Sequence, residues 1–136
     1  MPNFGTKSKR ILTELHPYLQ EILLQVIEEI DFSIICGCRS RNDQERAFRE
    51  HVSKLHYPYS KHNTIPSLAV DIIPYPTRWD DEKEFHKLAK VVICIANGMG
   101  YPVIWGGDWD GDGDTTDQTF NDLAHLQLKE VPNDMA

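Results

Sequence analysis

Residues 68–73 read LAVDII, an apolar run that a single carboxylate, Asp71, interrupts. Two prolines, Pro74 and Pro76, follow the run, which is typical of a short buried β-strand that ends at a proline. An aspartate inside such a strand is costly unless it is paired or bound to a metal. We therefore expect Asp71 to face a cleft. The alternatives are an edge-strand aspartate in contact with solvent and a structural ion pair.

Other segments predict the elements around this strand. Apolar residues recur at helical spacing over residues 10–30, and a second amphipathic helix begins at Asp80 and Asp81 and ends near Gly98. A shorter helix, capped by Ser40 or Asn42, is expected to run through about Glu50. Short apolar segments predict further strands at 32–36, 101–105 and 124–128, with loops at 51–66 and 106–120. This order predicts a single α+β domain over 1–136, with a small mixed or antiparallel sheet and helices packed on one face.

Composition narrows the function classes. The chain has 136 residues, and 40 % of them are hydrophobic, which suits one folded domain. The net charge of −7 argues against nucleic acid as a partner. No apolar run reaches the roughly 18 residues of a membrane span, and residues 1–10 lack the apolar core of a secretory signal. We therefore expect neither membrane insertion nor a signal peptide.

Cysteine usage points to a reducing compartment. The chain has three cysteines, and an odd number argues against a disulfide framework. Cys36 and Cys38 are interpreted as small buried thiols on one strand. A thiolate metal site is the alternative, although the Cys-x-Cys spacing is shorter than that of zinc knuckles.

A second strand also carries a polar interruption. His125 lies within the apolar segment 124–128, and Asp122 stands three residues before it. With His62 from the loop before Asp71, two imidazoles and one carboxylate form a set that suits zinc and leaves a fourth position for water. Asp122, near the same cleft, would act on that water as a general base. Taken singly, each residue has an ordinary alternative as a core histidine, a surface histidine or a turn aspartate.

Four motifs occur in order along the chain: SKH at 60–62, AVDI at 69–72, WGGDW at 105–109 and DLAH at 122–125. Together they resemble the zinc peptidases of bacterial cell walls, which include VanY-type D-Ala-D-Ala carboxypeptidases and the L-alanyl-D-glutamate peptidases of phage endolysins. The resemblance covers roughly residues 36–128 and implies a hedgehog/D-Ala-D-Ala-peptidase-like fold. The stretch 63–67 departs from it, because many relatives have a shorter gap with a glycine there.

The resemblance assigns roles to individual residues. It implies that His62, Asp71 and His125 are zinc ligands and that Asp122 is the catalytic base. The segment GCRS at 37–40 resembles the one in which the family carries an arginine that binds and polarises the scissile carbonyl, so Arg39 is the candidate. The implied enzyme is a zinc metallopeptidase, most simply a phage endolysin that cuts L-Ala-D-Glu.

Two alternatives and several accompanying expectations stay open at this point. The first alternative is a D-Ala-D-Ala carboxypeptidase, and the second is a non-catalytic module that binds zinc and calcium. The expected partner is the stem peptide of peptidoglycan, and we expect a monomer that is made in the host bacterial cytoplasm and reaches the cell wall after release. The candidate substrate-binding residues are Ser60, Lys61 and Trp105.

A second cation site is predicted in the acidic loop. Five carboxylates within ten residues repel one another unless a cation neutralises them. From Asp108 the spacing is EF-hand-like, with Gly113 in the sixth place, but Thr119 replaces the usual glutamate in the twelfth and no EF-hand helix precedes the loop. Calcium there would order the segment that leads to the DLAH motif, and a solvated acidic loop is the alternative. The candidate calcium ligands are Asp108, Asp110, Asp112, Asp114 and Asp117.

Overall fold

The computed structural model describes residues 3–76, 78–109 and 122–129. In chain order the elements are α1 (Thr6–Leu12), α2 (Pro17–Val26), β1 (Phe32–Cys36), α3 (Arg41–Arg49), the 3₁₀ helix η1 (Lys61–Asn63), β2 (Ala69–Pro74), α4 (Glu82–Met99), β3 (Val103–Trp105) and β4 (His125–Leu128). No helix among these residues is long and apolar enough to cross a membrane.

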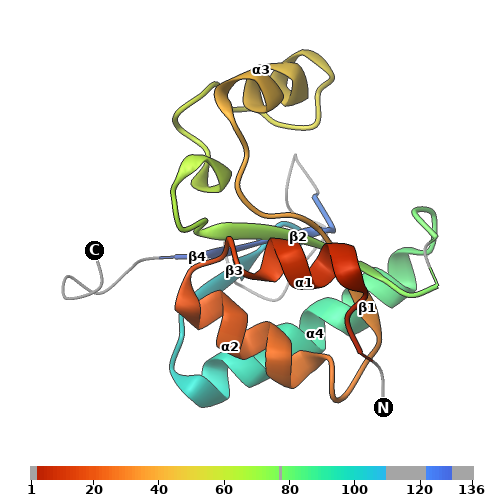
Figure 1. The fold of residues 1–136 in the computed structure, drawn as a ribbon. Helices are drawn as coiled ribbons and strands as arrows, with labels where there is room; N and C mark the ends of the chain where they lie inside the picture. The colour runs from red at the N-terminus through yellow and green to blue at the C-terminus, as the bar shows by residue number, and fades with distance from the viewer. Residues whose placement is uncertain (1–2, 77, 110–121, 130–136) are drawn as a thin grey trace.

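The four strands form one sheet in the order β1-β2-β4-β3. Each neighbouring pair is antiparallel. The last strand in sequence therefore lies inside the sheet, between β2 and β3 (Figure 1). The sheet and helices confirm the predicted α+β class.

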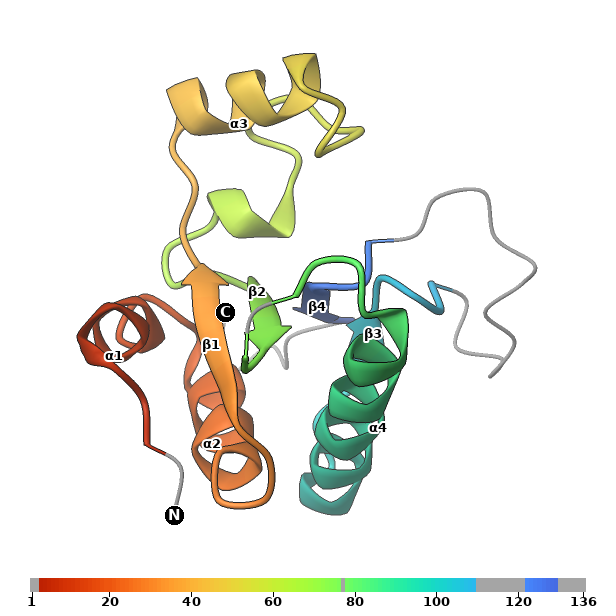
Figure 2. The same cartoon turned by 90° about the vertical axis from the view of Figure 1, so that its right-hand side faces the viewer.

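The helices divide into two groups. Figures 1 and 2 show α2 and α4 side by side below β2 and α1 next to β1, whereas α3 and η1 lie above β2. The lower group covers the core face of the sheet, as predicted for helices on one face. Among the described helices, α3 and η1 stand apart from this layer (Figure 2).

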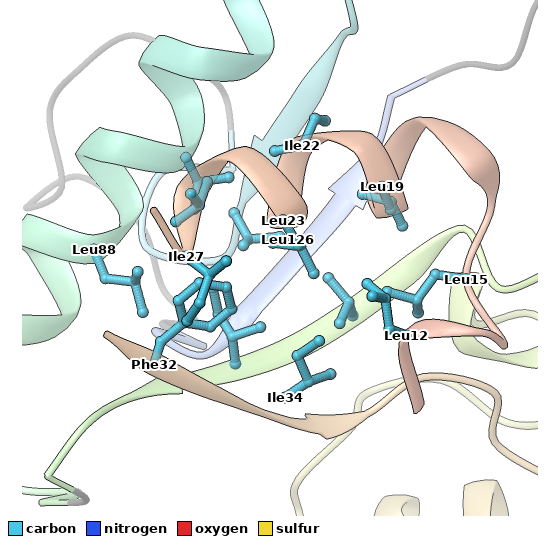
Figure 3. Packing of buried hydrophobic residues seen from close by; sticks show 14 of the residues in the cluster. Leu12, Leu15, Leu19, Ile22, Leu23, Ile27, Phe32, Ile34, Leu88 and Leu126 are labelled. Atoms are coloured by element: carbon cyan, nitrogen blue, oxygen red, sulfur yellow. The ribbon is translucent and has the colours of Figure 1, made fainter. Parts of the chain in front are cut away.

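The core lies between the sheet and the lower helices. Figure 3 shows Leu19, Ile22 and Leu23 of α2 in one cluster with Ile34 of β1 and Leu126 of β4. These five side chains are all at most 2 % exposed. Because burying a leucine or isoleucine stabilises a fold by roughly 1.5–3 kcal/mol, this layer carries most of the favourable energy of folding.

The prediction of one helix over 10–30 is wrong. The chain forms α1 and α2 instead, with a break at residues 13–16. Pro17 has no backbone N–H to continue a helix, but it is well suited to the first helical position. The Nδ1 atom of His16 caps the new helix by accepting from the Tyr18 N–H at 3.1 Å.

The other helix ends follow the sequence signals. Ser40, rather than Asn42, caps α3, since its Oγ accepts from the Asp43 N–H at 3.2 Å. Gly100 ends α4 in the left-handed conformation, with φ at +78°, which favours glycine.

Candidate metal and catalytic site

Strand pairing brings the first two site residues together. Asp71 of β2 and His125 of β4 are directly opposed in the antiparallel register. Directly opposed residues project to the same face of a sheet. His62 reaches the same point from η1, which lies beside β2. Two segments that are close in sequence, η1 and β2, therefore converge on one position with the distant β4.

The three side chains form a nearly equilateral triangle. The Oδ1 atom of Asp71 lies 3.3 Å from Nε2 of His62 and 3.2 Å from Nδ1 of His125. The two nitrogens are themselves 3.2 Å apart. A tetrahedral zinc ion with bonds of about 2.0–2.1 Å requires ligand atoms about 3.3 Å apart, so the triangle fits one face of that tetrahedron.

The outer nitrogens of both histidines have acceptor partners. Nδ1 of His62 lies 2.7 Å from the carbonyl oxygen of Gly37, and Nε2 of His125 lies 2.8 Å from Oε1 of Gln127. Each outer nitrogen therefore carries the proton and donates it. In neutral rings the inner nitrogens then present bare lone pairs toward the Asp71 carboxylate. Such a set of electron-rich atoms needs a cation at its centre, either a proton or a metal.

The pKa shifts of His62 and Asp71 also indicate that a cation is favoured between these side chains. Burial lowers the pKa of His62, but its hydrogen bond and charge interaction with Asp71 outweigh burial and raise the pKa to about 10. Burial likewise raises the pKa of Asp71, and hydrogen bonds with His125 and His62 outweigh it, so the pKa falls well below its usual range. Without a metal, the Asp71 carboxylate therefore favours the protonated form of His62.

Arg39 lies on the far side of the Asp71 carboxylate. Its Nη2 is 3.4 Å from Asp71 Oδ2, the oxygen that faces away from the histidines. Its backbone N–H donates to the carbonyl of His62 at 2.7 Å. The family resemblance implied Arg39 as a site residue, and the structure brings it into contact with two of the three candidate ligands.

Asp122 approaches the cluster at the entrance to β4. Its carboxylate, Asp71 and His125 offer ligand atoms within 4.8 Å of one another. Burial and the nearby Asp71 charge raise its pKa. Its backbone is held by Gly106, whose carbonyl accepts from the Asp122 N–H at 3.0 Å. A Cβ atom at Gly106 would lie 2.1 Å from the Asp122 carbonyl oxygen, so only glycine allows this close approach.

A cleft of about 220 Å³ opens beside the cluster. Its lining includes His62, His125 and Asp122, so two of the three candidate zinc ligands border the cleft. The lining residues are Arg39, Val52, Ser53, Lys54, Leu55, Ser60, Lys61, His62, Trp109, Asp122, His125 and Gln127.

The candidate substrate-binding residues have different positions. Ser60 and Lys61 line the cleft, and Ser60 also begins η1, because its Oγ accepts from the His62 N–H at 3.2 Å. Trp105 is not among the lining residues of the described chain. It is buried, and its Nε1 donates to the Leu123 carbonyl at 2.9 Å, so its role is packing. Trp109 lies in the cleft instead, with its ring 5.3 Å from the ring of His125.

Two residues of this region, Gln127 and Gln44, had not been assigned to the site from the sequence, and a third, Cys36, had been named only as an alternative metal ligand. Gln127 holds His125, and its position two residues along the same strand is a signal that alternation could have used. Gln44 binds the Arg39 guanidinium and gave no sequence signal. The Cys36 Sγ lies 3.9 Å from both His62 Nδ1 and Arg39 Nη2, and Cys36, His62 and Asp71 offer ligand atoms within 4.8 Å of one another, which is compatible with the thiolate alternative. Cys36 is half-buried, as is Cys38, which lies beyond β1, so the interpretation of two buried thiols on one strand is wrong.

The predicted calcium loop falls mostly outside the described residues, which include only Asp108 of its five candidate ligands. The Asp108 N–H donates to the carbonyl of Trp105 at 3.0 Å, in the turn after β3. Calcium binding there stays a prediction.

Comparisons with known proteins agree on one family. The model of a family described as phage L-alanyl-D-glutamate peptidase matches residues 2–129. The chain is 28 % identical over 133 residues to the L-alanyl-D-glutamate peptidase of Escherichia phage T5, covering 92 % of this chain and 96 % of that protein. The crystal structure of the Serratia marcescens L-Ala D-Glu endopeptidase ChiX is similar with a TM-score of 0.71 and 25 % identity, over 93 % of this chain and 90 % of that one.

These matches confirm the resemblance drawn from the four motifs, and the structural match confirms the fold class. The family match covers nearly the whole chain, including every candidate ligand and Asp122. The chain belongs to the phage L-alanyl-D-glutamate peptidase family.

Proposed function

We propose that this chain is a zinc-dependent endopeptidase that hydrolyses the L-Ala–D-Glu bond in the stem peptide of peptidoglycan. The observation that carries the proposal is the triangle of His62, Asp71 and His125. Its ligand atoms lie 3.2–3.3 Å apart. The other ring nitrogen of each histidine is held by a hydrogen bond, to the Gly37 carbonyl for His62 and to Gln127 for His125. The family membership supports the reaction class, and both named relatives are L-Ala-D-Glu peptidases.

Zinc suits this donor set better than other common cations. Two imidazoles and one carboxylate are typical of catalytic zinc sites, whereas calcium and magnesium prefer oxygen ligands. A zinc ion in this position would lower the pKa of a bound water and polarise the substrate carbonyl. The open cleft beside the triangle leaves room for both water and peptide.

The protein's own groups supply the remaining chemistry. Asp122, whose pKa burial and the Asp71 charge raise, takes the proton from the attacking water and passes it to the leaving amine. Arg39 holds Asp71 at 3.4 Å and lines the cleft, where its guanidinium stabilises the negative charge that develops on the carbonyl oxygen. A non-catalytic metal module would have no use for these two groups beside an open position.

The decisive experiment is digestion of purified peptidoglycan followed by mass spectrometry of the muropeptides. The zinc-loaded chain is expected to release fragments with a new D-Glu amino terminus and a new L-Ala carboxyl terminus. Metal-stripped protein should release none, and added zinc should restore cleavage. Release of free D-Ala instead would identify the carboxypeptidase alternative, and bound zinc without any cleavage would favour a binding module.

The base assignment has its own test in Asp122→Asn. The amide keeps the shape of the side chain but cannot accept the proton, so the rate of hydrolysis should fall by about 10²–10⁴-fold. Zinc content, measured by atomic absorption, should stay at one ion per chain. Hydrolysis at the wild-type rate would show that another group is the base.

A further inference from the structure

Gln44 is a fully buried polar side chain in a helix that is otherwise mostly exposed. The α3 sequence is RNDQERAFR, and Gln44 and Ala47 are its buried residues. Gln44 has an exposed fraction of 0 %. Because α3 stands apart from the core layer (Figures 1 and 2), apolar packing does not explain why a glutamine is enclosed there.

The Gln44 amide uses its complete hydrogen-bonding capacity. Its Oε1 accepts from Arg39 Nη1 at 3.0 Å and from Asn63 Nδ2 at 3.3 Å. Its Nε2 donates to the Leu55 carbonyl at 2.7 Å and to Ser53 Oγ at 2.9 Å. An amide has two donor hydrogens and two acceptor lone pairs, so each is used once. A reversed amide would place its NH₂ against the donors of Arg39 and Asn63, and this fixes its orientation.

The carbonyl oxygen of Gln44 binds residues that contact the candidate zinc ligands. The Arg39 guanidinium lies between Gln44 and Asp71, with Nη1 on the first and Nη2 on the second. Asn63 donates to the Arg39 carbonyl at 3.0 Å and accepts from the Ser60 N–H at 3.0 Å, which ties the same point to η1. Gln44 therefore contacts the groups that hold Asp71 and His62 but contacts neither ligand.

The NH₂ group of Gln44 binds residues that form one wall of the cleft. Ser53, Lys54 and Leu55 all line that cleft, whereas Gln44 is not one of its lining residues. The Ser53 Oγ also accepts from the Leu55 N–H at 3.1 Å, so the wall segment is folded back on itself at the point where Gln44 binds it. The Gln44 amide thus connects residues 53–55, which line the cleft, to Arg39, which contacts Asp71.

We propose that Gln44 is a positioning residue that sets the Arg39 guanidinium against Asp71 through its carbonyl oxygen and sets wall residues 53–55 through its NH₂ group. The inference rests on the proposed hydrolysis. The two halves of the amide serve different steps. The oxygen side affects the stabilisation of developing charge by Arg39, and the nitrogen side affects the binding of peptide along the wall.

Two substitutions at Gln44 separate these halves. Gln44→Met has a similar shape but makes none of the four hydrogen bonds, so kcat should fall about tenfold or more and KM should rise several-fold. Gln44→Glu keeps both acceptor contacts but cannot donate to the Leu55 carbonyl. It should return kcat to within about threefold of wild type while KM stays raised. Equal kcat values in the two variants would overturn the division of roles.

A double-mutant cycle tests whether Gln44 acts through Arg39. If it does, Gln44→Met in an Arg39→Ala background should lower kcat no further, because the group that it positions is already absent. Independent, multiplying losses in kcat would overturn the proposal. Gln20→Met is a matched control, since the Gln20 Nε2 also makes a side-chain hydrogen bond, to the Leu15 carbonyl at 2.9 Å, but on α2. It should leave kcat and KM unchanged.

A readout that needs no catalysis keeps this test separate from the proposed function. In ¹⁵N NMR spectra of the full chain, the Arg39 guanidinium hydrogens should show slow rotation and exchange in wild type and in Gln44→Glu. They should be averaged in Gln44→Met, while thermal unfolding confirms that each variant is folded. An inactive wild type with an immobile Arg39 would refute the hydrolysis but support the positioning. An active wild type whose Arg39 signals and kcat are the same in Gln44→Met would refute the positioning alone.

Discussion

The two sides of β2 are held together by different forces. Below it, α1, α2 and α4 pack aliphatic side chains against the sheet. Above it, α3, η1 and residues 53–55 are joined by hydrogen bonds through Gln44, Asn63 and Arg39. Apolar packing is strong but has no preferred direction, whereas hydrogen bonds are weaker and directional. The lower side thus stabilises the fold, and the upper side sets the geometry of the site.

A single strand serves both sides because its side chains alternate. Val70 and Ile72 of β2 point into the core, where they are at most 2 % exposed. Asp71, between them, points to His62 and His125 on the other side of the sheet. Substitutions on the two sides should therefore separate stability from activity.

The largest expected effect is loss of a ligand on the upper side. His125→Ala should abolish zinc binding and lower the rate of hydrolysis by at least about 10³-fold, because two protein ligands cannot replace three. Because His125 is buried and hydrogen-bonds to Asp71 and Gln127, the metal-free variant should also lose about 1–3 kcal/mol in the free energy of unfolding relative to metal-free wild type. Metal analysis and urea unfolding check both statements, and full zinc content in the variant would refute the ligand assignment.

The next effect is a cavity on the lower side. Leu23 is completely buried, so Leu23→Ala should lower the free energy of unfolding by about 2–5 kcal/mol. At a temperature where the variant stays folded, its kcat should equal that of wild type. Chemical denaturation and muropeptide kinetics on the same sample measure the two quantities. A kcat reduced in proportion to stability would show that the two sides are not separable.

Acidity should affect the upper side through His62. The pKa of His62 is about 10 without metal, so a zinc ion must displace a proton from this side chain to bind. Below pH 10, each unit of acidification should therefore weaken zinc binding by about tenfold, or roughly 1.4 kcal/mol. Since the folded pKa is raised, this proton stabilises the metal-free fold fully below about pH 6.5, and the stabilisation is lost as pH rises through about 10. Calorimetry in several buffers should detect about one proton released per zinc near neutral pH. Zinc affinity that does not change with pH would contradict this account.

The smallest effect is loss of a helix cap. Ser60→Ala removes the oxygen that accepts from the His62 N–H, which should cost about 1 kcal/mol and weaken zinc affinity by a few-fold. Ser40→Ala is the matched control, because it removes the equivalent cap of α3 without contacting a ligand. It should cost similar stability and leave zinc affinity unchanged. Identical zinc affinities in the two variants would mean that η1 does not position His62.

Local sequence signals predicted the parts of the molecule that depend on local interactions. The run at 68–73 indicated a strand, and the cost of burying Asp71 indicated a site. Pro17 could have corrected the prediction of one helix over 10–30, since proline both interrupts one helix and favours the start of another.

The pairing of distant residues could not be predicted in the same way. Nothing local to Asp71 or His125 specifies that they are opposed across β2 and β4, because the register is set by packing of the complete sheet. The motif order, through the family resemblance, supplied Arg39 as a site residue. Gln44 was missed because a glutamine on a charged helix normally faces solvent, and its burial depends on Arg39, Asn63 and Leu55 meeting around it.

The interior position of β4 has a consequence for the time at which the enzyme becomes active. β1 and β2 can pair as soon as both have left the ribosome, but β3 joins the sheet only through β4, which is synthesised last of the four. β4 also carries His125, so the step that completes the sheet is the step that completes the ligand set. A chain that has not yet been extended to β4 therefore lacks one of the three candidate zinc ligands.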